Sequence, residues 1–466
     1  MSLWSRKELQ EIFTCKLPDN FSVEGISIDS RTLVSGDLFF ALKAGQSDGH
    51  NYVLDAASKG ASAVVVSHLI PNCPCSQILV DDTFKALNDL GRYGRLRSKA
   101  KIIAITGSVG KTTAKEVLLQ TLAAFGSVSA SVASYNNHWG VPLSLARLPK
   151  DAKFGIFEIG MNHPGEITPL AQMVNPHVAI ITAIAPAHIG QMGNLENIAK
   201  EKACIFDGLA EDGVAIIPDS SEFTSLLRQK AMARHPERVY IFGNQDSSDV
   251  KLVGYDLVNG QAKLTIGLGQ KDKVNVNFAL LGQHLANSAL IALAVSKALR
   301  LDVQKTIAKL SEIQQIEGRG RIHKVLLENR EVSLFDDSYN ANLSSALAAV
   351  KTLSTISPDK EGRRIAVLGE MLELGSFALD HHAQLIKSCL SMNVDKIYLC
   401  GGSVMEQAYA IVPEENRGAY FRTAQDLIPI VLRDVGDGDI VLVKGSKGSR
   451  VSCVAESILK QNQKRG

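Results

Sequence analysis

The sequence AITGSVGKTT at residues 104–113 restricts the possible folds more than any other part of the 466-residue chain. The pattern predicts a buried strand at residues 101–105 and a helix at residues 111–125 that ends at Gly126. Between them, Gly107 and Gly110 allow backbone N–H groups to face an anion at the helix N-terminus, where the helix dipole favours negative charge. We therefore predict a phosphate-binding loop, and the alternative of a plain strand-to-helix turn is disfavoured.

This loop is shorter than the usual G-x-x-x-x-G-K-[ST] form, because position 105 holds isoleucine where the first glycine is expected. Lys111 would neutralise charge on the β- and γ-phosphates, and Thr112 or Thr113 could offer a hydroxyl group to Mg²⁺. A phosphate loop alone does not distinguish a kinase, a GTPase, an ATPase or a ligase. The chain lacks the Asn-Lys-x-Asp sequence that would indicate guanine recognition.

Short β-rich runs alternate with helical patterns along the chain, which predicts an α/β fold with parallel sheets. The length exceeds that of one hydrophobic core, and we divide the chain into residues 1–86, 87–315 and 316–466. The net charge of +2 gives no support to a nucleic-acid partner. Seven scattered cysteines and the absence of a long apolar run indicate a reduced, cytoplasmic protein without membrane insertion, and a monomer is the default expectation.

Two further runs predict polar groups at the ends of buried strands. In FGIFEIGMNHPGEI, Glu158 ends an apolar strand, and a carboxylate at that edge of a phosphate-loop domain suits a Mg²⁺ ligand. In AIITAIAPAHIG, a second apolar strand leads to His188 at the same edge. Taken singly, a loop carboxylate is more often solvated and a lone histidine is more often structural.

The run NLENIAKEKACIFDGLAEDG predicts a helix that begins after an N-cap at Asn194. Its apolar stripe has 3-4-3-4 spacing and consists of Leu195, Ile198, Lys202, Ile205 and Leu209. Lys202 therefore occupies a position where an apolar residue is expected, whereas Lys200 points away. Either Lys202 extends its amine to the surface, or burial lowers its pKa and leaves a neutral amine that could form a carbamate with CO₂.

Five motifs, ITGSVGKTTAKE, YNNHWGVPL, EIGMNHPGEI, PAHIG and AKEKACIF, occur in the order typical of the Mur ligases. The chain resembles this family of ATP-dependent, amide-forming enzymes of peptidoglycan precursor synthesis over its whole length. The resemblance implies a small N-terminal UDP-sugar-binding α/β domain, a central P-loop ATPase-like parallel-sheet domain and a C-terminal Rossmann-like domain. The short glycine loop is also found in folylpolyglutamate synthetases.

Within the family, EIGMNHPGEI and DSYNAN are typical of the ligase that joins D-alanyl-D-alanine to UDP-N-acetylmuramoyl-tripeptide (UDP-MurNAc-tripeptide) through an acyl phosphate. The preceding ligase usually carries Glu-Val-Ser-Ser-His and Asp-Asn-Pro-Arg motifs, which this chain lacks. The resemblance therefore implies ATP and Mg²⁺ as cofactors, and UDP-MurNAc-tripeptide and D-Ala-D-Ala as substrates. A folate-polyglutamate ligase and a nucleotide-binding scaffold without ligase activity are the alternatives.

The resemblance also implies roles for individual residues. The reacting groups would face Lys111, Glu158, His188, Lys202 and Asn137, with Asn136 beside them. ATP would contact Gly107, Ser108, Val109, Gly110, Lys111, Thr112, Thr113, Asn287, Arg319, Asp337 and Tyr339. Mg²⁺ would lie near Thr112, Glu158, His188 and Lys202. Lys202 aligns with the lysine that is carbamylated in related ligases. The UDP-sugar would lie near Ser30 and Arg31.

The chain departs from the family pattern at a few positions. Leu285 follows His284 where asparagine is common, and Leu343 stands where proline usually follows the SYNAN motif. The run GRGR leaves open whether Arg319 or Arg321 contacts ATP.

Overall fold

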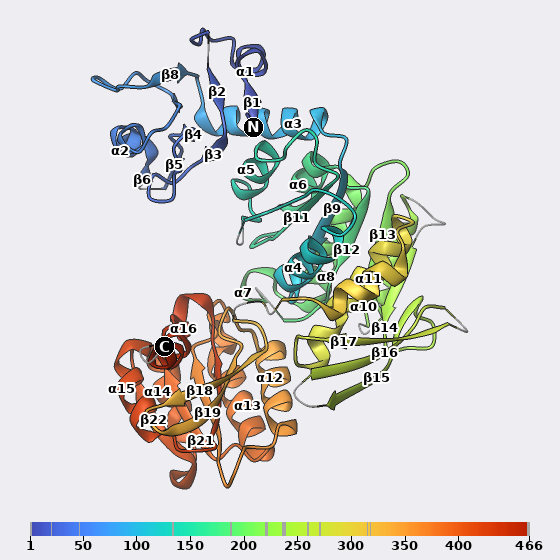
Figure 1. Cartoon of the computed structure of the whole chain (residues 1–466), viewed down its shortest axis with the longest axis vertical. Coiled ribbons are helices and arrows are strands. Elements are labelled where there is room, and N and C mark those ends of the chain that lie inside the picture. The colour runs from blue at the N-terminus through green and yellow to red at the C-terminus, as the bar shows by residue number, and fades with distance from the viewer. Residues whose placement is uncertain are drawn as a thin grey trace.

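The computed structural model describes residues 2–19, 21–45, 47–132, 135–186, 189–219, 222–234, 239–258, 261–269, 272–314, 316 and 318–463. Three main sheets of four, nine and six strands follow one another along the chain. In Figure 1 they are stacked from the N-terminal part at the top to the C-terminal part at the bottom. The alternation of strands and helices predicted an α/β fold, and this is confirmed.

The N-terminal sheet contains four parallel strands in the order β3-β4-β7-β8. These strands span Gly25–Ser27, Asp37–Phe40, Ala63–Val66 and Ser76–Leu79. Two small antiparallel pairs accompany them, β1 (Trp4–Ser5) with β2 (Ser22–Val23) and β5 (Lys43–Ala44) with β6 (Ser47–Asp48). The helices are α1 (Arg6–Phe13), η1 (Gly49–Tyr52), α2 (Val53–Ser58) and α3 (Thr83–Arg97).

Helix α3 connects the N-terminal sheet to the central part of the chain. Its Leu87 and Leu90 belong to the N-terminal hydrophobic core, whereas its glycine face packs against α5 (Gly140–Ala146) of the central part. A Cβ atom at Gly94 would lie only 2.3 Å from the Leu145 carbonyl oxygen, so the two helices approach closely. The boundary that we predict at residue 86 falls inside this helix, and the exact division into domains remains a prediction.

The central sheet has nine strands in the order β10-β11-β9-β12-β13-β14-β15-β16-β17. The seven strands from β10 to β15 in this order are parallel, and β16 and β17 extend the sheet in antiparallel fashion. In chain order the strands are β9 (Lys101–Thr106), β10 (Val128–Ala130), β11 (Phe154–Glu158), β12 (Val178–Ile181), β13 (Val214–Pro218), β14 (Val239–Gly243), β15 (Val250–Val258), β16 (Gln261–Gly267) and β17 (Lys273–Phe278).

Helices cover both faces of this sheet. Alternate residues of β9 reach opposite layers, with Ile103 and Ile105 in the hydrophobic cluster of α4 and α10, and Ile102 and Ala104 in that of α5, α6, α8 and α9. Burial on both faces explains why the strand reads as a continuous apolar run. The helices are α4 (Lys111–Leu122), α6 (Ile167–Val174), α7 (Ile189–Met192), α8 (Leu195–Ala203), η2 (Cys204–Gly208), α9 (Thr224–Met232), α10 (Gln283–Ala298) and α11 (Val303–Ser311).

Two predicted helices end earlier than expected. Helix α4 stops at Leu122 rather than at residue 125, because the Ala124 and Phe125 N–H groups bond three residues back in a tighter turn. Helix α8 stops at Ala203 and continues as the 3₁₀ segment η2, so the predicted stripe crosses two elements. The N-cap at Asn194 is confirmed, since its side chain accepts from the Asn197 N–H at 2.8 Å.

The C-terminal sheet has the order β18-β19-β23-β20-β21-β22, in which only the β18–β19 pair is antiparallel. Its strands are β18 (Arg321–Leu327), β19 (Arg330–Asp336), β20 (Arg364–Gly369), β21 (Lys396–Cys400), β22 (Arg417–Phe421) and β23 (Ile440–Lys444). The helices are α12 (Leu343–Thr355), η3 (Gly375–Phe377), α13 (Ala378–Ser391), α14 (Ser403–Ile411), η4 (Glu414–Asn416), α15 (Ala424–Asp434), η5 (Lys447–Ser449) and α16 (Ser452–Gln463).

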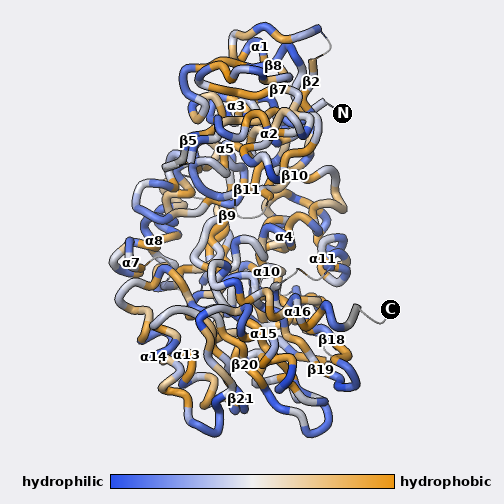
Figure 2. Tube along the Cα trace, turned by 90° about the vertical axis from the view of Figure 1, so that its left-hand side faces the viewer, coloured by the Kyte–Doolittle hydropathy of each residue, from blue (hydrophilic) through white to orange (hydrophobic). Residues whose placement is uncertain are grey.

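Hydrophobic and hydrophilic stretches alternate through all three parts of the chain in Figure 2. Each part has its own buried clusters, which agrees with a length that exceeds one core. Among the described residues, no helix combines the length and apolar character needed to cross a bilayer.

The contact between α3 and α5 yields a stability prediction. Replacing glycine by alanine inside a helix usually stabilises it, but at Gly94 the new methyl group would meet the Leu145 carbonyl. We expect Gly94→Ala to lower the free energy of unfolding by about 1–3 kcal/mol, seen as a lower midpoint in thermal unfolding followed by circular dichroism. Gly254→Ala, where the nearest atom would lie at 3.5 Å, is the control; equal midpoints would contradict the packing argument.

Candidate active site

A cavity of ≈ 500 Å³ lies between the central and C-terminal parts of the chain. The central part contributes the phosphate loop, the residues after β11 and β12, and the start of α10. The C-terminal part contributes the loops after β19, β20 and β23. These loops follow the carboxyl ends of adjacent parallel strands, the usual position of ligand sites in α/β folds.

The phosphate loop has the backbone geometry that its glycines predict. Gly110 is the N-cap of α4 with φ 82°, and Gly107 has φ 147°, both in the region that favours glycine. A Cβ atom at Gly107 would lie 1.9 Å from the Thr182 hydroxyl oxygen. The Ser108 N–H donates to the Ala183 carbonyl at 2.9 Å, which fixes the loop against the segment after β12.

Lys111, the first residue of α4, folds back over this loop. Its ammonium donates to the Gly107 carbonyl at 2.6 Å. Burial lowers the pKa of Lys111, and the Glu158 carboxylate partly opposes that shift. The lysine thus lies at the place where phosphate oxygens would face the loop.

Glu158 ends β11 and is fully buried at the edge of the cavity. Its Oε2 accepts from the Thr112 hydroxyl at 3.3 Å. Its Oε1 has no hydrogen-bond donor within the described part of the chain, and its nearest ion-pair partner is the Lys115 ammonium at 3.9 Å. A buried carboxylate oxygen of this kind is available to a hard cation.

Lys202 projects from α8 into the same cavity with only 1 % of its surface exposed. Burial, reinforced by the positive charge of Lys111, lowers the pKa of Lys202 well below its usual value. The neighbouring Glu201 accepts from the backbone N–H groups of Gly165 and Ile167 at the start of α6, which holds α8 in place. Lys200 points outward and pairs with Glu196 at 2.7 Å, as the spacing predicted.

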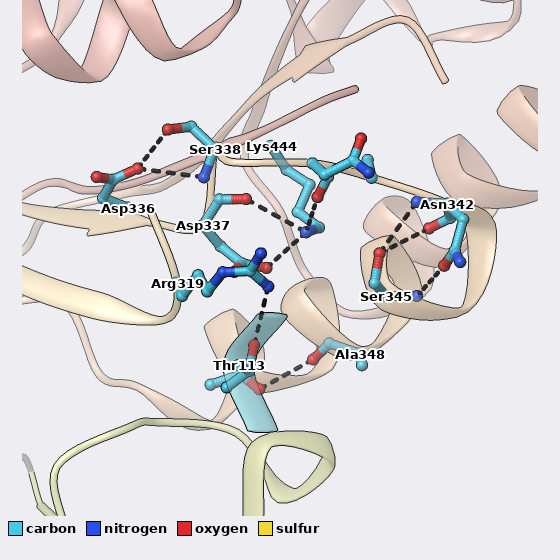
Figure 3. A network of polar contacts seen from close by, with 12 residues as sticks. Thr113, Arg319, Asp336, Asp337, Ser338, Asn342, Ser345, Ala348 and Lys444 are labelled. Atoms are coloured by element: carbon cyan, nitrogen blue, oxygen red, sulfur yellow. Dashed lines mark hydrogen bonds and ion pairs between the residues drawn. The ribbon is translucent and has the colours of Figure 1, made fainter. Parts of the chain in front are cut away.

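The C-terminal part reaches the phosphate-loop helix through Arg319. Its guanidinium donates to the Thr113 hydroxyl at 2.8 Å and stacks on the Tyr339 ring at 4.1 Å. Figure 3 shows this contact beside the ion pair of Asp337 with Lys444, which measures 2.8 Å. Arg319 lines the cavity and Arg321 begins β18, so the geometry favours Arg319 as the arginine that faces the loop.

His284 lies at the start of α10 and also lines the cavity. Burial lowers its pKa to about 4, with Asp337 opposing and Lys444 reinforcing that shift. Its Nδ1 atom is buried and has no hydrogen-bond partner among the described residues. A neutral histidine therefore faces the junction of the two parts, although the usual asparagine is absent after it.

Other predicted site residues have different surroundings. Asn137 and Asn287 line the cavity, and the Asn137 side chain also accepts from the Gly140 N–H at the start of α5. Ser30 is buried in the N-terminal part, and Arg31 is exposed and paired with Asp29 at 2.7 Å. Neither Ser30 nor Arg31 lines this cavity. His188 lies outside the described residues.

The donor set fits Mg²⁺ in part. Thr112 and Glu158 provide a hydroxyl and a carboxylate, the hard oxygen ligands that Mg²⁺ prefers. Within the described ranges, no group of three or more His, Cys, Asp or Glu side chains could form a metal cage by itself. This suits an ion that is shared with nucleotide phosphates and water.

Comparison with known proteins decides the family. Three family models match, described as Mur ligase family, catalytic domain (residues 22–78), Mur ligase middle domain (105–296) and Mur ligase, glutamate ligase domain (320–447). A Rickettsia prowazekii protein named UDP-N-acetylmuramoyl-tripeptide--D-alanyl-D-alanine ligase is 32% identical over 97% of this chain and 99% of its own length. The chain belongs to the Mur ligase family.

Solved structures of other Mur ligases agree with this fold. A crystal structure of MurF from Acinetobacter baumannii is 28% identical, has a TM-score of 0.83 and covers 98% of this chain and 99% of its own. MurF from Thermotoga maritima, solved in complex with ADP, is 23% identical with a TM-score of 0.80, over 97% of this chain and 100% of its own. The predicted three-part Mur ligase architecture is therefore confirmed.

Sequence reasoning did not single out Lys115, which lies behind Glu158 at this site. It lies one turn after Lys111 on α4, is only 2 % exposed, and its ammonium contacts the Ser131 carbonyl at 2.7 Å and Glu116 at 2.9 Å. It is also the cation nearest to Glu158 Oε1. The sequence carried part of the signal, because Lys115 precedes Leu118 and Leu122 at helical spacing and so shares their buried face, but only the fold brings it near Glu158.

We expect Lys115→Met to lower the free energy of unfolding by roughly 3 kcal/mol, because Glu158 would remain buried with less positive charge around it. The measurement is urea unfolding followed by tryptophan fluorescence and circular dichroism. Lys115→Arg keeps the charge and should lose less. Lys200→Met removes only an exposed pair and should change stability by about 0.5 kcal/mol or less; an equal loss in Lys200→Met and Lys115→Met would refute this role.

Proposed function

We propose that this Mur ligase is an ATP-dependent enzyme that adds D-alanyl-D-alanine to UDP-MurNAc-tripeptide in peptidoglycan precursor synthesis. The relative from Rickettsia prowazekii is named for this activity, and the match covers 97% of this chain and 99% of the relative. The observation that carries the proposal is the single cavity that joins the phosphate loop, Glu158 and Lys202 to the loops of the C-terminal sheet. Such a cavity can bring the phosphates of a nucleotide, the reacting carboxyl group of the acyl donor and an amine to one place.

The reaction forms an amide from a carboxylate, which needs a better leaving group than oxide. The terminal carboxylate of the tripeptide attacks the γ-phosphoryl group of ATP and gives an acyl phosphate and ADP. The amine of D-Ala-D-Ala then attacks the acyl carbon, loses its proton, and phosphate leaves. Each step moves negative charge through the region between Lys111 and the C-terminal loops.

The residues of the chain contribute position and electrostatics. Lys111 and the N-terminus of α4 stabilise charge on the transferred phosphoryl group. Arg319 bridges from the C-terminal part to Thr113 and brings a second cation to the nucleotide side. Enclosure between the two parts excludes water, which would otherwise hydrolyse an acyl phosphate.

Mg²⁺ would be held by Thr112 and Glu158 together with nucleotide oxygens, and when bound it would supply charge neutralisation for phosphoryl transfer. In its ammonium form Lys202 cannot be a ligand of this ion. As a neutral amine it can add to CO₂ and release a proton, which would place a carbamate anion in the cavity that Glu158 also lines. The proposed sites for the UDP-sugar at Ser30 and Arg31, and for a third ligand at His188, rest on the resemblance.

The substrate assay tests the function directly. Purified protein with UDP-MurNAc-tripeptide, ATP and Mg²⁺ should release phosphate only when D-Ala-D-Ala is added, and mass spectrometry should show the pentapeptide product. Equal turnover with UDP-MurNAc-dipeptide and single amino acids would instead indicate the preceding ligase of the series. Nucleotide binding without any substrate-stimulated phosphate release would indicate a scaffold.

Lys202 yields a second test. We expect Lys202→Ala to lose at least about 100-fold in kcat, because the cavity then lacks the carbamate anion, and a short carboxylate such as acetate should restore part of the rate. Lys200→Ala, two residues away on the exposed side of α8, should keep the wild-type rate. Wild-type turnover by Lys202→Ala would eliminate the carbamate hypothesis.

A further inference from the structure

Segment 370–377 follows β20 and forms one wall of the cavity, with Leu372, Glu373 and Leu374 among its lining residues. Two buried side chains anchor it, Met371 at 1 % and Leu374 at 4 % exposure. Leu372 and Glu373 stand exposed between these anchors. The buried side chains therefore fix the segment on both sides of the exposed pair Leu372 and Glu373.

Hydrogen bonds fix the backbone of this pair. The Met371 N–H donates to Nε2 of the buried His382 at 2.9 Å, and the Leu372 N–H donates to the Ser446 hydroxyl at 3.0 Å. Glu373 itself has φ 65°, the left-handed region that side chains other than glycine seldom adopt. Such conformations are concentrated at functional sites, where the surrounding structure enforces them.

The segment also touches the central part of the chain. Its end, η3, contacts α7, and a Cβ atom on Gly375 would lie 3.9 Å from the Gly190 Cα atom. In Figure 1, α7 lies where the central part meets the C-terminal part. Glu373 thus lines the cavity from the C-terminal side, close to where this part meets the central part.

The negative charge of Glu373 acts on Lys111 of the phosphate loop. Burial lowers the pKa of Lys111, and Glu373 and Glu158 are the two carboxylates that oppose this shift. Asp337, Glu158 and Glu166 are the other carboxylates that line the cavity, and Glu373 is the one contributed by the segment after β20.

The proposed reaction brings a positively charged nucleophile to this cavity, since an alkyl amine is an ammonium ion near neutral pH. It must lie close to the acyl phosphate, on the side away from the nucleotide. An exposed carboxylate flanked by Leu372 suits an ammonium group followed by a small apolar side chain.

On this basis, and resting on the proposed function, we propose that Glu373 binds the ammonium group of the incoming zwitterionic dipeptide and thereby positions the amine for attack. The residue acts on the acceptor and not on acyl-phosphate formation. Hydroxylamine separates the two steps, because it is uncharged at neutral pH and traps an acyl phosphate as a hydroxamate.

The experiment compares wild-type protein with Glu373→Gln, Glu373→Asp and Glu328→Gln. Glu328 is a matched control, since it is also exposed and has φ 57°, but it lies in the turn between β18 and β19. Phosphate release is measured against D-Ala-D-Ala concentration, and hydroxamate formation is measured with hydroxylamine in place of the dipeptide. Thermal unfolding checks that all variants fold.

We expect Glu373→Gln to raise KM for D-Ala-D-Ala at least about ten-fold, the effect of losing a charge-assisted hydrogen bond. Hydroxamate formation and KM for ATP should stay within two-fold of wild type. Glu373→Asp should be intermediate, and Glu328→Gln should match wild type. An unchanged KM for the dipeptide, or an equal fall in hydroxamate formation, would overturn the role of Glu373. If D-Ala-D-Ala does not stimulate phosphate release by the wild-type protein, the proposed function is overturned, and the role of Glu373 with it.

Discussion

The in-register parallel pairing of β9 with β11 and β12 is the constraint on which the rest of the site depends. Glu158 pairs with Ile105, and Ile181 pairs with Thr106, so the three strands end at the same level. This register brings together the phosphate loop after β9, Glu158 at the end of β11 and Thr182 after β12, which supports the loop. A slip of one residue would turn each of these side chains to the other face of the sheet.

Much of this arrangement could be predicted from the sequence, because it depends on local patterns. Two glycines between an apolar strand and a helix indicated the loop, and the spacing of the predicted stripe singled out Lys202 as a lysine at an apolar position, which the structure shows to be buried. The antiparallel strands β15–β17 were harder to foresee, since their alternation fits any half-exposed strand and pairing direction depends on the partner. Lys115 was missed because its significance arises from a carboxylate 43 positions later, which only the fold brings near.

The cavity combines opposite charges in an ordered way. Lys111, Arg319 and Lys444 line it, and each of the three has a protein acceptor at short range. Glu373 stands on another segment of the lining, the one that follows β20. This separation suits a reaction in which an anionic donor and a cationic acceptor approach a common point from different directions.

Helix α3 has a mechanical consequence. One side of it packs in the N-terminal core and the other side packs against the backbone of α5. The helix therefore connects two of the three parts rigidly. Relative rotation of those two parts would have to break the glycine contacts along its length. The C-terminal part meets the cavity through polar side chains and loop segments instead, which makes it the part best suited to move as substrates enter and leave.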